Sequence, residues 1–502
     1  MFKIETMIER IRLERLRDKV MTAQEAVKLI ENGMVVGASG FTKAGDSKVI
    51  LPELAKRNHN DEFKITLMTG ASLGHGTDGK LAEAGILKKR MPFQVDPILR
   101  KKINSGEVLF IDQHLSESAE LLHNKNLPEV DIAVIECVYI DRDGSLVPTT
   151  SVGNSVTFAA LAKKVILEIN TAVNEDLYGI HDIYQAEDYP YRNVIPIVAP
   201  WNKIGRKTIP LNPDKIAAIV FTNQLDSPAD IAPPDEKTKN IAKHILKFFE
   251  EEVRLGHLTD RLLPIQAGIG KVANAVLTGF IDSNFYDLTM FSEVLQDSTF
   301  DLMDAGKLSF ASASSVTVSS ECYERVFGNL QKYRDKFVLR PQNISNTPGL
   351  IRRLGIIAIN TAIEFDIYGN VNSTHLAGTK IMNGIGGSGD FARNAYLSIF
   401  VTQSASKEDR ISHILPMVSH TDHTEHDVDI LVTDIGLADL RGLAPRERAQ
   451  KIIDNCVHDD YKEELQSYFD RACERGGHTP HLLEEAFSWH IRFNQTGSMK
   501  KN

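Results

Sequence analysis

Short apolar segments that alternate with helical segments are the feature that most constrains the fold of this chain. Residues 65–68 (ITLM), 131–140 and 217–222 are rich in β-branched and aromatic side chains and are typical of buried strands. Helical patterns occur between such runs, among them residues 23–31 and 48–56. Strands that are apolar throughout are usually covered on both faces, as in parallel sheets connected by helices. We therefore predict an α/β fold with mostly parallel sheets.

The second half of the chain repeats the pattern of the first half. Residues 65–70 (ITLMTG) align with residues 288–293 (LTMFSE), and residues 133–146 align with residues 358–371 at nearly the same separation. Two related, open α/β domains explain this match, and chance similarity between buried strands is the alternative. In the second pair the turn residues fall in register: Asp141 with Asp366, and Gly144 with Gly369.

The clearest interruption is the proline-rich stretch 227–235 (SPADIAPPD). Proline lacks a backbone N–H and fits neither a helix interior nor a central strand. We place the domain boundary there, which predicts an N-terminal α/β domain at residues 1–228 and a C-terminal α/β domain at residues 229–502. We expect the active site to lie between the two domains.

Glu293 is difficult to explain by packing alone. It directly follows the apolar run 288–291, and an unpaired buried charge is expensive. Two glycine-rich segments, 266–271 (QAGIGK) and 383–390 (NGIGGSGD), are candidates to surround it with backbone N–H groups. That combination indicates a covalent nucleophile beside an oxyanion hole, and an exposed glutamate in a turn is the alternative. If the repeat holds, Gly70 takes the place of Glu293, and the chemistry belongs to the C-terminal half alone.

Charge and composition exclude several functional classes. The net charge of −10 argues against a general nucleic-acid binder, and no apolar run is long enough to cross a bilayer. The N-terminal residues 1–17 lack the apolar core of a secretory signal and contain three glutamates, which fits a mitochondrial transit peptide poorly. The 4 cysteines are far apart and form no C-x-x-C motif, so we expect reduced thiols in a cytoplasmic enzyme.

The glycines in residues 69–79 do not form a convincing nucleotide site. No G-K-[ST] follows them, so a P-loop is excluded. Residues 74–79 satisfy G-x-G-x-x-G, but the match begins well after the strand and lacks a downstream acidic residue. We interpret this segment as a loop rather than a dinucleotide site.

Four motifs together resemble the acetyl-CoA hydrolase/transferase family, which comprises class I coenzyme A transferases. The chain looks like the long members that act as succinyl-CoA:acetate or propionyl-CoA:succinate CoA-transferases, and the resemblance covers nearly all of it. It implies a ping-pong CoA transfer through a glutamyl-CoA thioester, with Glu293 as the nucleophile; acyl-CoA hydrolysis by the same residue is the alternative. The motifs are 266–275 (QAGIGKVANA), 291–297 (FSEVLQD), 369–374 (GNVNST) and 382–391 (MNGIGGSGDF).

The resemblance also assigns residues around Glu293. It implies that Ile269 and Gly387 donate N–H groups to the oxyanion. Asn346 resembles an active-site asparagine that hydrogen-bonds a substrate carboxylate, although an asparagine before Thr-Pro is equally a turn residue. The implied CoA-binding residues are Ile265, Gln266, Ala267, Gly268, Ile269, Gly270, Asn383, Gly384, Gly386, Gly387 and Lys407.

The implied reaction needs no resident cofactor, because coenzyme A is a substrate that is held only transiently as a thioester. The expected partners are acyl-CoA and small carboxylic acids such as acetate, succinate or propionate. We expect neither nucleic acid nor a membrane as a partner. Chains of the family often pair, which predicts a homodimer.

Three histidines need a separate interpretation. His420, His423 and His426 form H-x-x-H-x-x-H with acidic neighbours, a pattern that could bind zinc. The segment is poor helix material, so we predict a hydrogen-bonded structural or CoA-proximal loop and no metal site. Two departures from relatives leave the acyl specificity open: Asp434 stands where many carry glutamate, and no arginine lies near Ser227.

Overall fold

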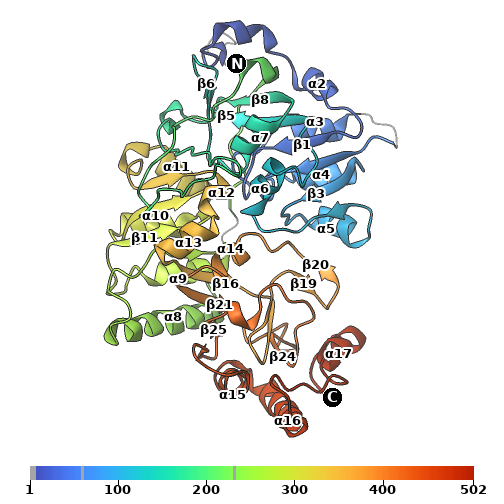
Figure 1. Ribbon diagram of the computed structural model, residues 1–502, viewed down its shortest axis with the longest axis vertical. Helices are drawn as coiled ribbons and strands as arrows, with labels where there is room; N and C mark the ends of the chain where they lie inside the picture. Colours follow the sequence, from blue (N-terminus) through green and yellow to red (C-terminus); the bar gives the residue numbers. More distant parts are fainter. Residues whose placement is uncertain (1–6, 58–61, 230–232, 502) are drawn as a thin grey trace. The chain divides into compact units, whose positions relative to one another are not determined.

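The computed structural model describes residues 7–57, 62–229 and 233–501, and its contacts divide the chain into two compact units (Figure 1). The units do not follow a single cut of the chain. The domains 1–228 and 229–502 therefore stay a prediction about its organisation. Unit 1 consists of Met1–Asp230, Met290–Phe300 and Phe310–Leu350, and unit 2 of Ile231–Thr289, Asp301–Ser309 and Ile351–Asn502.

Unit 1 contains a seven-stranded sheet with the order β4-β3-β2-β1-β5-β8-β9, in which all neighbouring strands are parallel. Every residue of β5 is buried, and its branched side chains suit a pleated, covered surface. The strands are β1 (Val35–Ala38), β2 (Ile65–Met68), β3 (Leu87–Met91), β4 (Leu109–Phe110), β5 (Ile132–Cys137), β8 (Lys164–Asn170) and β9 (Ile216–Thr222). The helices are α2 (Ala23–Ala26), α3 (Ile50–Lys56), α4 (Thr77–Glu83), α5 (Pro97–Asn104), α6 (Glu117–His123) and α7 (Ser155–Leu161).

Unit 2 has its own series of neighbouring strands, β10-β16-β21-β25-β26, of which only β26 runs antiparallel to its neighbour. The strands are β10 (Ile265–Ala267), β16 (Ile357–Thr361), β21 (Leu397–Val401), β25 (Ile430–Val432) and β26 (Leu437–Asp439). The helices are α8 (Glu236–Arg254), α9 (Lys271–Gly279), α14 (Ser388–Ala392), α15 (Pro445–Cys456), α16 (Asp459–Arg475) and α17 (Ser488–Thr496).

The segment 288–354 contributes residues to both units, and it contains Glu293 and Asn346. β12 and β14 pair in parallel, and so do β13 and β15. The strands are β11 (Leu288–Phe291), β12 (Val294–Leu295), β13 (Leu308–Ala313), β14 (Ser315–Val316) and β15 (Phe337–Leu339). The helices are α10 (Asp297–Asp304), α11 (Ser320–Phe327), α12 (Gln342–Ser345) and α13 (Pro348–Leu354).

The predicted repeat is confirmed by the backbone. The series β10-β16-β21-β25 matches β1-β5-β8-β9 in order and direction. Gly144 and Gly369 occupy equivalent turns with φ of 86° and 91°, a region that favours glycine. Their N–H groups bond the carbonyls of Asp141 at 2.9 Å and Asp366 at 3.0 Å. Two related α/β folds are therefore present, as the sequence predicts.

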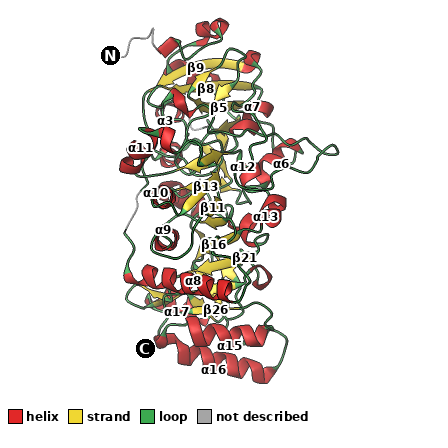
Figure 2. Ribbon diagram, turned by 90° about the vertical axis from the view of Figure 1, so that its left-hand side faces the viewer, coloured by secondary structure: helices red, strands yellow, loops and turns green. Residues whose placement is uncertain are grey.

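Each unit has a separate hydrophobic core. Ile50, Leu67 and Ile132 belong to the core of unit 1, while Phe400 and Trp489 belong to that of unit 2. In unit 2, α15 and α16 lie side by side at one end of the chain (Figure 2). Within the described ranges, we find no helix with the length and apolar character that a membrane span requires.

Candidate active site

Glu293 is the residue that joins β11 to β12. Its carbonyl oxygen accepts the N–H groups of Ser314 at 2.9 Å and Ser315 at 3.1 Å, and the preceding Ser292 N–H bonds the Ser312 carbonyl at 2.9 Å. Its flanking residues are buried, while Glu293 itself is partly exposed. The prediction of a carboxylate at the end of a buried strand is confirmed, and the backbone on which it stands is fixed on both sides.

Asn346 lies beside that carboxylate. Its Nδ2 donates a hydrogen bond of 2.8 Å to Glu293 Oε1, and its side chain is fully buried. Asn346 directly follows the short helix α12, where its N–H bonds the Gln342 carbonyl at 2.8 Å. The structure thus brings together two residues that the sequence singled out. The role predicted for Asn346 toward a substrate carboxylate stays a prediction.

The environment of Glu293 changes its acidity. Burial raises the pKa of Glu293 to about 7, and the hydrogen bond from Asn346 opposes that rise. A carboxylate that has lost part of its hydration is a better nucleophile than one in water. The site can therefore hold Glu293 as a reactive anion just above neutral pH.

Glycines at strand ends of the N-terminal sheet approach α12 closely. A Cβ atom at Gly70, just after β2, would lie 2.6 Å from the Gly40 carbonyl oxygen and 2.9 Å from Gln342 Oε1. Gln342 is one helical turn before Asn346, and its N–H bonds the Gly153 carbonyl at 3.0 Å. The N-terminal half therefore contributes to the surroundings of Asn346. The presence of glycines was the only sign of this contact in the sequence, because the residues that they approach are far away along the chain.

The first predicted CoA-binding loop lies in unit 2, after β10. Ile265, Gln266 and Ala267 are buried strand residues, whereas Ile269 is 45% exposed. Gly268 donates its N–H to the Ile359 carbonyl at 3.0 Å. Gly270 has a φ of 118° and precedes α9, so it forms the turn into that helix. Ile269 is thus the open part of this segment.

The second glycine-rich loop also lies in unit 2, between β20 (Lys380–Ile381) and α14. Gly386 has a φ of 59°, and Gly387 caps α14. A hydrogen bond to His423 holds this loop in place, since the His423 Nε2 lies 3.1 Å from Ser388 Oγ. Asn383 and Gly384 stand at the beginning of this loop, next to β20.

His423 and Asp434 make structural contacts in unit 2. The His423 ring packs at 4.8 Å from that of Phe400. The interpretation of this segment as a hydrogen-bonded structural or CoA-proximal loop stays a prediction. Asp434 Oδ1 accepts the Ser404 N–H at 2.5 Å. The shorter side chain at position 434 therefore holds the neighbouring loop at Ser404 through a hydrogen bond to the backbone of that loop.

Lys407 and His420 have their own partners. The exposed Lys407 holds its Nζ 5.7 Å from the ring centroid of Phe493. The His420 ring stacks at 3.8 Å on that of His375, and its Nε2 lies 3.3 Å from Asp422. Among the described residues, no three His, Cys, Asp or Glu side chains are arranged to hold a metal ion.

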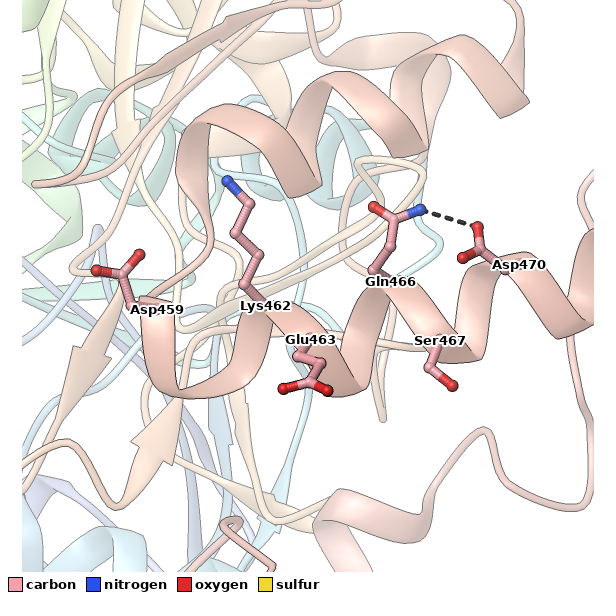
Figure 3. Close-up of a pocket in the computed structure, with 6 residues that line it drawn as sticks. All are labelled: Asp459, Lys462, Glu463, Gln466, Ser467 and Asp470. Carbon is pink, nitrogen blue, oxygen red and sulfur yellow. Dashed lines mark hydrogen bonds between the residues drawn. The ribbon is translucent and has the colours of Figure 1, made fainter.

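A surface hollow of about 510 Å³ runs along α16 and has a different character (Figure 3). All of its lining residues come from that one helix, and Gln466 Nε2 bonds Asp470 Oδ1 at 2.9 Å. Lys462 Nζ reaches the carbonyl of Asp454 on α15 at 2.9 Å. None of the predicted site residues lines this hollow.

Comparison with known proteins identifies the family. Residues 7–220 match the acetyl-CoA hydrolase/transferase N-terminal domain, and residues 322–469 match the C-terminal domain of the same family. A succinyl-CoA:acetate CoA-transferase of Clostridium kluyveri is 50% identical over 495 residues, covering 98% of this chain and 92% of the relative. A propanoyl-CoA:succinate CoA transferase of Escherichia coli is 42% identical and covers 95% and 98%. An acetyl-CoA hydrolase of Saccharomyces cerevisiae is also 42% identical and covers 98% and 97%.

Solved structures agree on the fold. RipA of Yersinia pestis superposes with a TM-score of 0.69 at 20% identity, covering 90% of this chain and 96% of RipA. A 4-hydroxybutyrate CoA-transferase of Porphyromonas gingivalis gives a TM-score of 0.63 at 19% identity, covering 91% and 99%. The two domain matches and the long alignments to relatives go further than the fold, and they show that the chain belongs to the acetyl-CoA hydrolase/transferase family of enzymes.

Proposed function

We propose that this protein moves coenzyme A between a short-chain acyl-CoA and a free carboxylate through a covalent glutamyl-CoA thioester on Glu293. The observation that carries the proposal is the partly buried Glu293 carboxylate, held by Asn346 Nδ2 at 2.8 Å. Relatives named as CoA-transferases over nearly the whole chain support the reaction class.

The first half of the proposed reaction loads Glu293. One Glu293 oxygen attacks the thioester carbonyl carbon, the carbon–sulfur bond breaks, and CoA leaves as a thiolate. The product is a mixed anhydride between the acyl group and Glu293. The thiolate then attacks the Glu293 carbonyl carbon, the anhydride bond breaks, and the acyl group leaves as a free carboxylate. Glu293 now carries CoA as a thioester.

The second half reverses these steps with a different acid. The incoming carboxylate attacks the carbonyl carbon of the Glu293 thioester, and the CoA thiolate is released. A new mixed anhydride between Glu293 and the incoming acid is the product. The thiolate then attacks the acyl carbon of that anhydride. The new acyl-CoA leaves, and Glu293 returns as a carboxylate. The thioester bond is exchanged rather than hydrolysed, so the cycle needs no ATP.

Negative charge develops on a carbonyl oxygen at each attack. By family resemblance, the N–H groups of Ile269 and Gly387 stabilise it, and one such donor contributes about 3 kcal/mol. Asn346 keeps the attacking carboxylate in place, which removes most of the orientational freedom that the reaction would otherwise have to restrict. Coenzyme A is a substrate in this scheme, and no resident cofactor takes part.

Hydrolysis of acyl-CoA is the second candidate, because several relatives at 41–43% identity are named acetyl-CoA hydrolases. Water would then resolve the glutamyl-CoA thioester. The two reactions use the same Glu293, and they differ in whether CoA is freed when no acceptor acid is present.

One assay separates the two candidates. Purified protein is incubated with acetyl-CoA or succinyl-CoA and a panel of acids (acetate, propionate, butyrate and succinate), and acyl-CoA products are separated by chromatography while free thiol is measured. Transfer predicts a new acyl-CoA that depends on the acceptor and little free CoA without it. Steady release of free CoA without an acceptor would instead identify a hydrolase.

We also infer a homodimer, as the family resemblance implies, and a location in the cytoplasm, which the 4 widely separated cysteines favour. Light scattering on the purified protein and fractionation of the source cells test these two inferences. A monomeric mass, or recovery outside the cytoplasmic fraction, would reject the corresponding one.

A further inference from the structure

A lysine is buried among carboxylates in unit 1, and the proposed reaction uses none of them. Lys48 Nζ lies 2.7 Å from a Glu136 oxygen, 2.9 Å from an Asp226 oxygen and 3.7 Å from an Asp46 oxygen. Three of the four side chains have no exposed surface, and that of Asp226 is 15% exposed. We call Asp46, Lys48, Glu136 and Asp226 the Lys48 cluster.

The charges of the Lys48 cluster do not balance. One ammonium group faces three carboxylates, so the cluster has excess negative charge unless it holds protons. Burial raises the pKa of Asp46 to about 7 and that of Glu136 to about 8. Burial lowers the pKa of Lys48, but the surrounding carboxylates outweigh it and hold this pKa well above its usual value. The lysine therefore stays charged, while Asp46 and Glu136 exchange protons near neutral pH.

Other titratable groups also face the Lys48 cluster. Burial raises the pKa of Glu168, which accepts hydrogen bonds from Ser47 Oγ and from the N–H groups at the start of α3. Burial lowers the pKa of His75, whose charge is also opposed by Lys48. Burial raises the pKa values of Tyr323 and Cys137, which removes both groups from the neutral range.

The Lys48 cluster is bonded to the segment after β7 (Leu146–Val147). Thr149 Oγ1 donates to Glu136 Oε2 at 2.5 Å, and Thr150 Oγ1 donates to Asp226 Oδ2. The Gly45 N–H also donates to Asp226, at 3.0 Å. The position of both threonines thus depends on how the carboxylates of the cluster are oriented.

The same segment supports the backbone of Glu293. The Thr150 carbonyl accepts the Val316 N–H at 2.9 Å, and Ser151 forms an antiparallel bridge with Ser315. The Ser315 N–H in turn donates to the Glu293 carbonyl at 3.1 Å. A short series of hydrogen bonds therefore leads from the buried lysine to the residue that carries the proposed nucleophile.

We propose that the Lys48 cluster is a proton-holding support that positions Glu293 through residues 149–151, so that loss of its protons lowers turnover but not acyl-CoA binding. The inference rests on the proposed role of Glu293 in CoA transfer. Full ionisation of the three carboxylates makes them repel one another, which displaces Thr149 and Thr150 and loosens the contact with Ser315. Lys48 touches no substrate in this account and acts only as a positioning residue.

Asp46→Asn is the sharpest test, because it mimics the protonated carboxyl group. Asp46 Oδ2 accepts the Gly74 N–H at 2.8 Å, a bond that the amide oxygen can keep, while Oδ1 has no hydrogen-bond partner among the described residues. Between pH 7 and 9 we expect kcat of the wild type to fall about fivefold with KM for acyl-CoA unchanged, and kcat of Asp46→Asn to fall less than about twofold. Identical pH profiles of the two proteins would overturn the inference.

Lys48→Met provides a second test, with Lys163→Met as its control. Lys163 is an exposed lysine of unit 1 that pairs with Asp131 at 2.7 Å. We expect Lys48→Met to lower kcat at pH 7 about 30-fold with KM within about twofold, and the control to change neither. A folded Lys48→Met protein with full kcat would contradict the positioning role.

A measurement without substrate tests the Lys48 cluster independently of the proposed function. Ionised Asp46 destabilises the fold, so Asp46→Asn should raise Tm relative to the wild type, and by more at pH 9 than at pH 5. Equal Tm values at pH 9 would overturn the inference even if CoA transfer is confirmed. Absence of acyl exchange by the wild type would instead reject the proposed function, and with it the effect on turnover.

Discussion

The ends of β2 and β11 are equivalent places in the two repeats, and they carry different residues. Both strands have the same pattern of burial, with only their second residue partly exposed. Two residues beyond β2 stands Gly70, whereas Glu293 stands two residues beyond β11. At the end of β2, the missing side chain of Gly70 leaves space beside Gln342 Oε1. At the end of β11, Glu293 presents its carboxylate to Asn346.

This difference shows how a repeated frame can acquire one reactive centre. The framework is common to both halves, since residues 35–40 (VVGASG) align with residues 265–270 (IQAGIG), and the aligned Gly40 and Gly270 have φ of 123° and 118°. In the proposed reaction, the specific chemistry depends on this one position of the second repeat. Gly70 is not a spare copy of Glu293, because its missing side chain lets the N-terminal sheet approach the helix that holds Asn346. The equivalence can be tested by changing each strand end in turn.

The largest effect is expected at the strand end that carries the proposed nucleophile, Glu293. Glu293→Gln keeps the size of the side chain and an oxygen that can accept from Asn346, but it cannot form the anhydride. We expect kcat for acyl exchange to fall at least about 10⁴-fold. An exchange assay with labelled acetate measures this loss, and residual activity above one hundredth of the wild type would show that Glu293 is not the nucleophile.

Removing the partner of the carboxylate should have the next largest effect. Asn346→Ala deletes the hydrogen bond to Glu293, and we expect kcat to fall about 100-fold. Because that bond lowers the pKa of Glu293, its loss should move the acid limb of the pH–rate profile to higher pH. Asn343→Ala, on the same helix α12, is the matched control and should leave both quantities unchanged. An unmoved acid limb in Asn346→Ala would contradict the predicted link.

A side chain at the other strand end should have a smaller effect. In Gly70→Ala the new Cβ lies 2.6 Å from the Gly40 carbonyl oxygen and 2.9 Å from Gln342 Oε1, so the Gly40 backbone and the Gln342 side chain on α12, the helix before Asn346, have to move. We expect kcat to fall about tenfold, since a small misplacement of a positioning group is already costly. Gly349→Ala, in α13, meets only a methyl group at 3.9 Å and serves as the control. Wild-type kcat for Gly70→Ala would show that the close approach has no role in catalysis.

The smallest effect concerns stability. The pKa of Glu293 is about 7 in the folded chain against an ordinary value of 4.5, so the folded state binds this proton more tightly than the unfolded state does. The resulting stability is complete below pH 4.5 and is lost as the pH rises through 7. Glutamine cannot ionise and avoids that loss.

We therefore expect Glu293→Gln to be more stable than the wild type by about 2 kcal/mol at pH 8 and equally stable at pH 4. Urea unfolding at both pH values measures the difference in the free energy of unfolding. The exposed Glu83→Gln should show no such dependence on pH. A destabilised Glu293→Gln protein at pH 8 would mean that the carboxylate is not strained by its surroundings.

Local sequence patterns were sufficient for the frame of the molecule. Period and composition predicted the parallel α/β repeats, and the charge after a buried strand pointed to Glu293. The capping box of Thr22 and Glu25 at the start of α2 is present as its residue types indicate. These features depend on neighbours within a few residues, so the chain itself displays them.

Long-range partners could not be predicted in the same way. Lys48 falls in a run that looks like the start of a helix, yet α3 begins at Ile50 and the lysine side chain bonds Glu136 and Asp226. No local period connects such distant positions. Two further features could not be predicted for the same reason: the approach of Gly70 to Gln342 and the placement of Met290–Phe300 in unit 1. The sequence pointed to Glu293 and Asn346, but the contacts of Lys48 and of Gly70 required the structure.

The most direct test of the account is to trap CoA on Glu293. The wild type is incubated with acyl-CoA in the absence of an acceptor acid, treated with borohydride, digested and examined by mass spectrometry. The account predicts that Glu293 alone is converted from a carboxyl to a primary alcohol, and only when acyl-CoA is present. An enzyme that transfers CoA normally but leaves Glu293 unmodified under these conditions would contradict it.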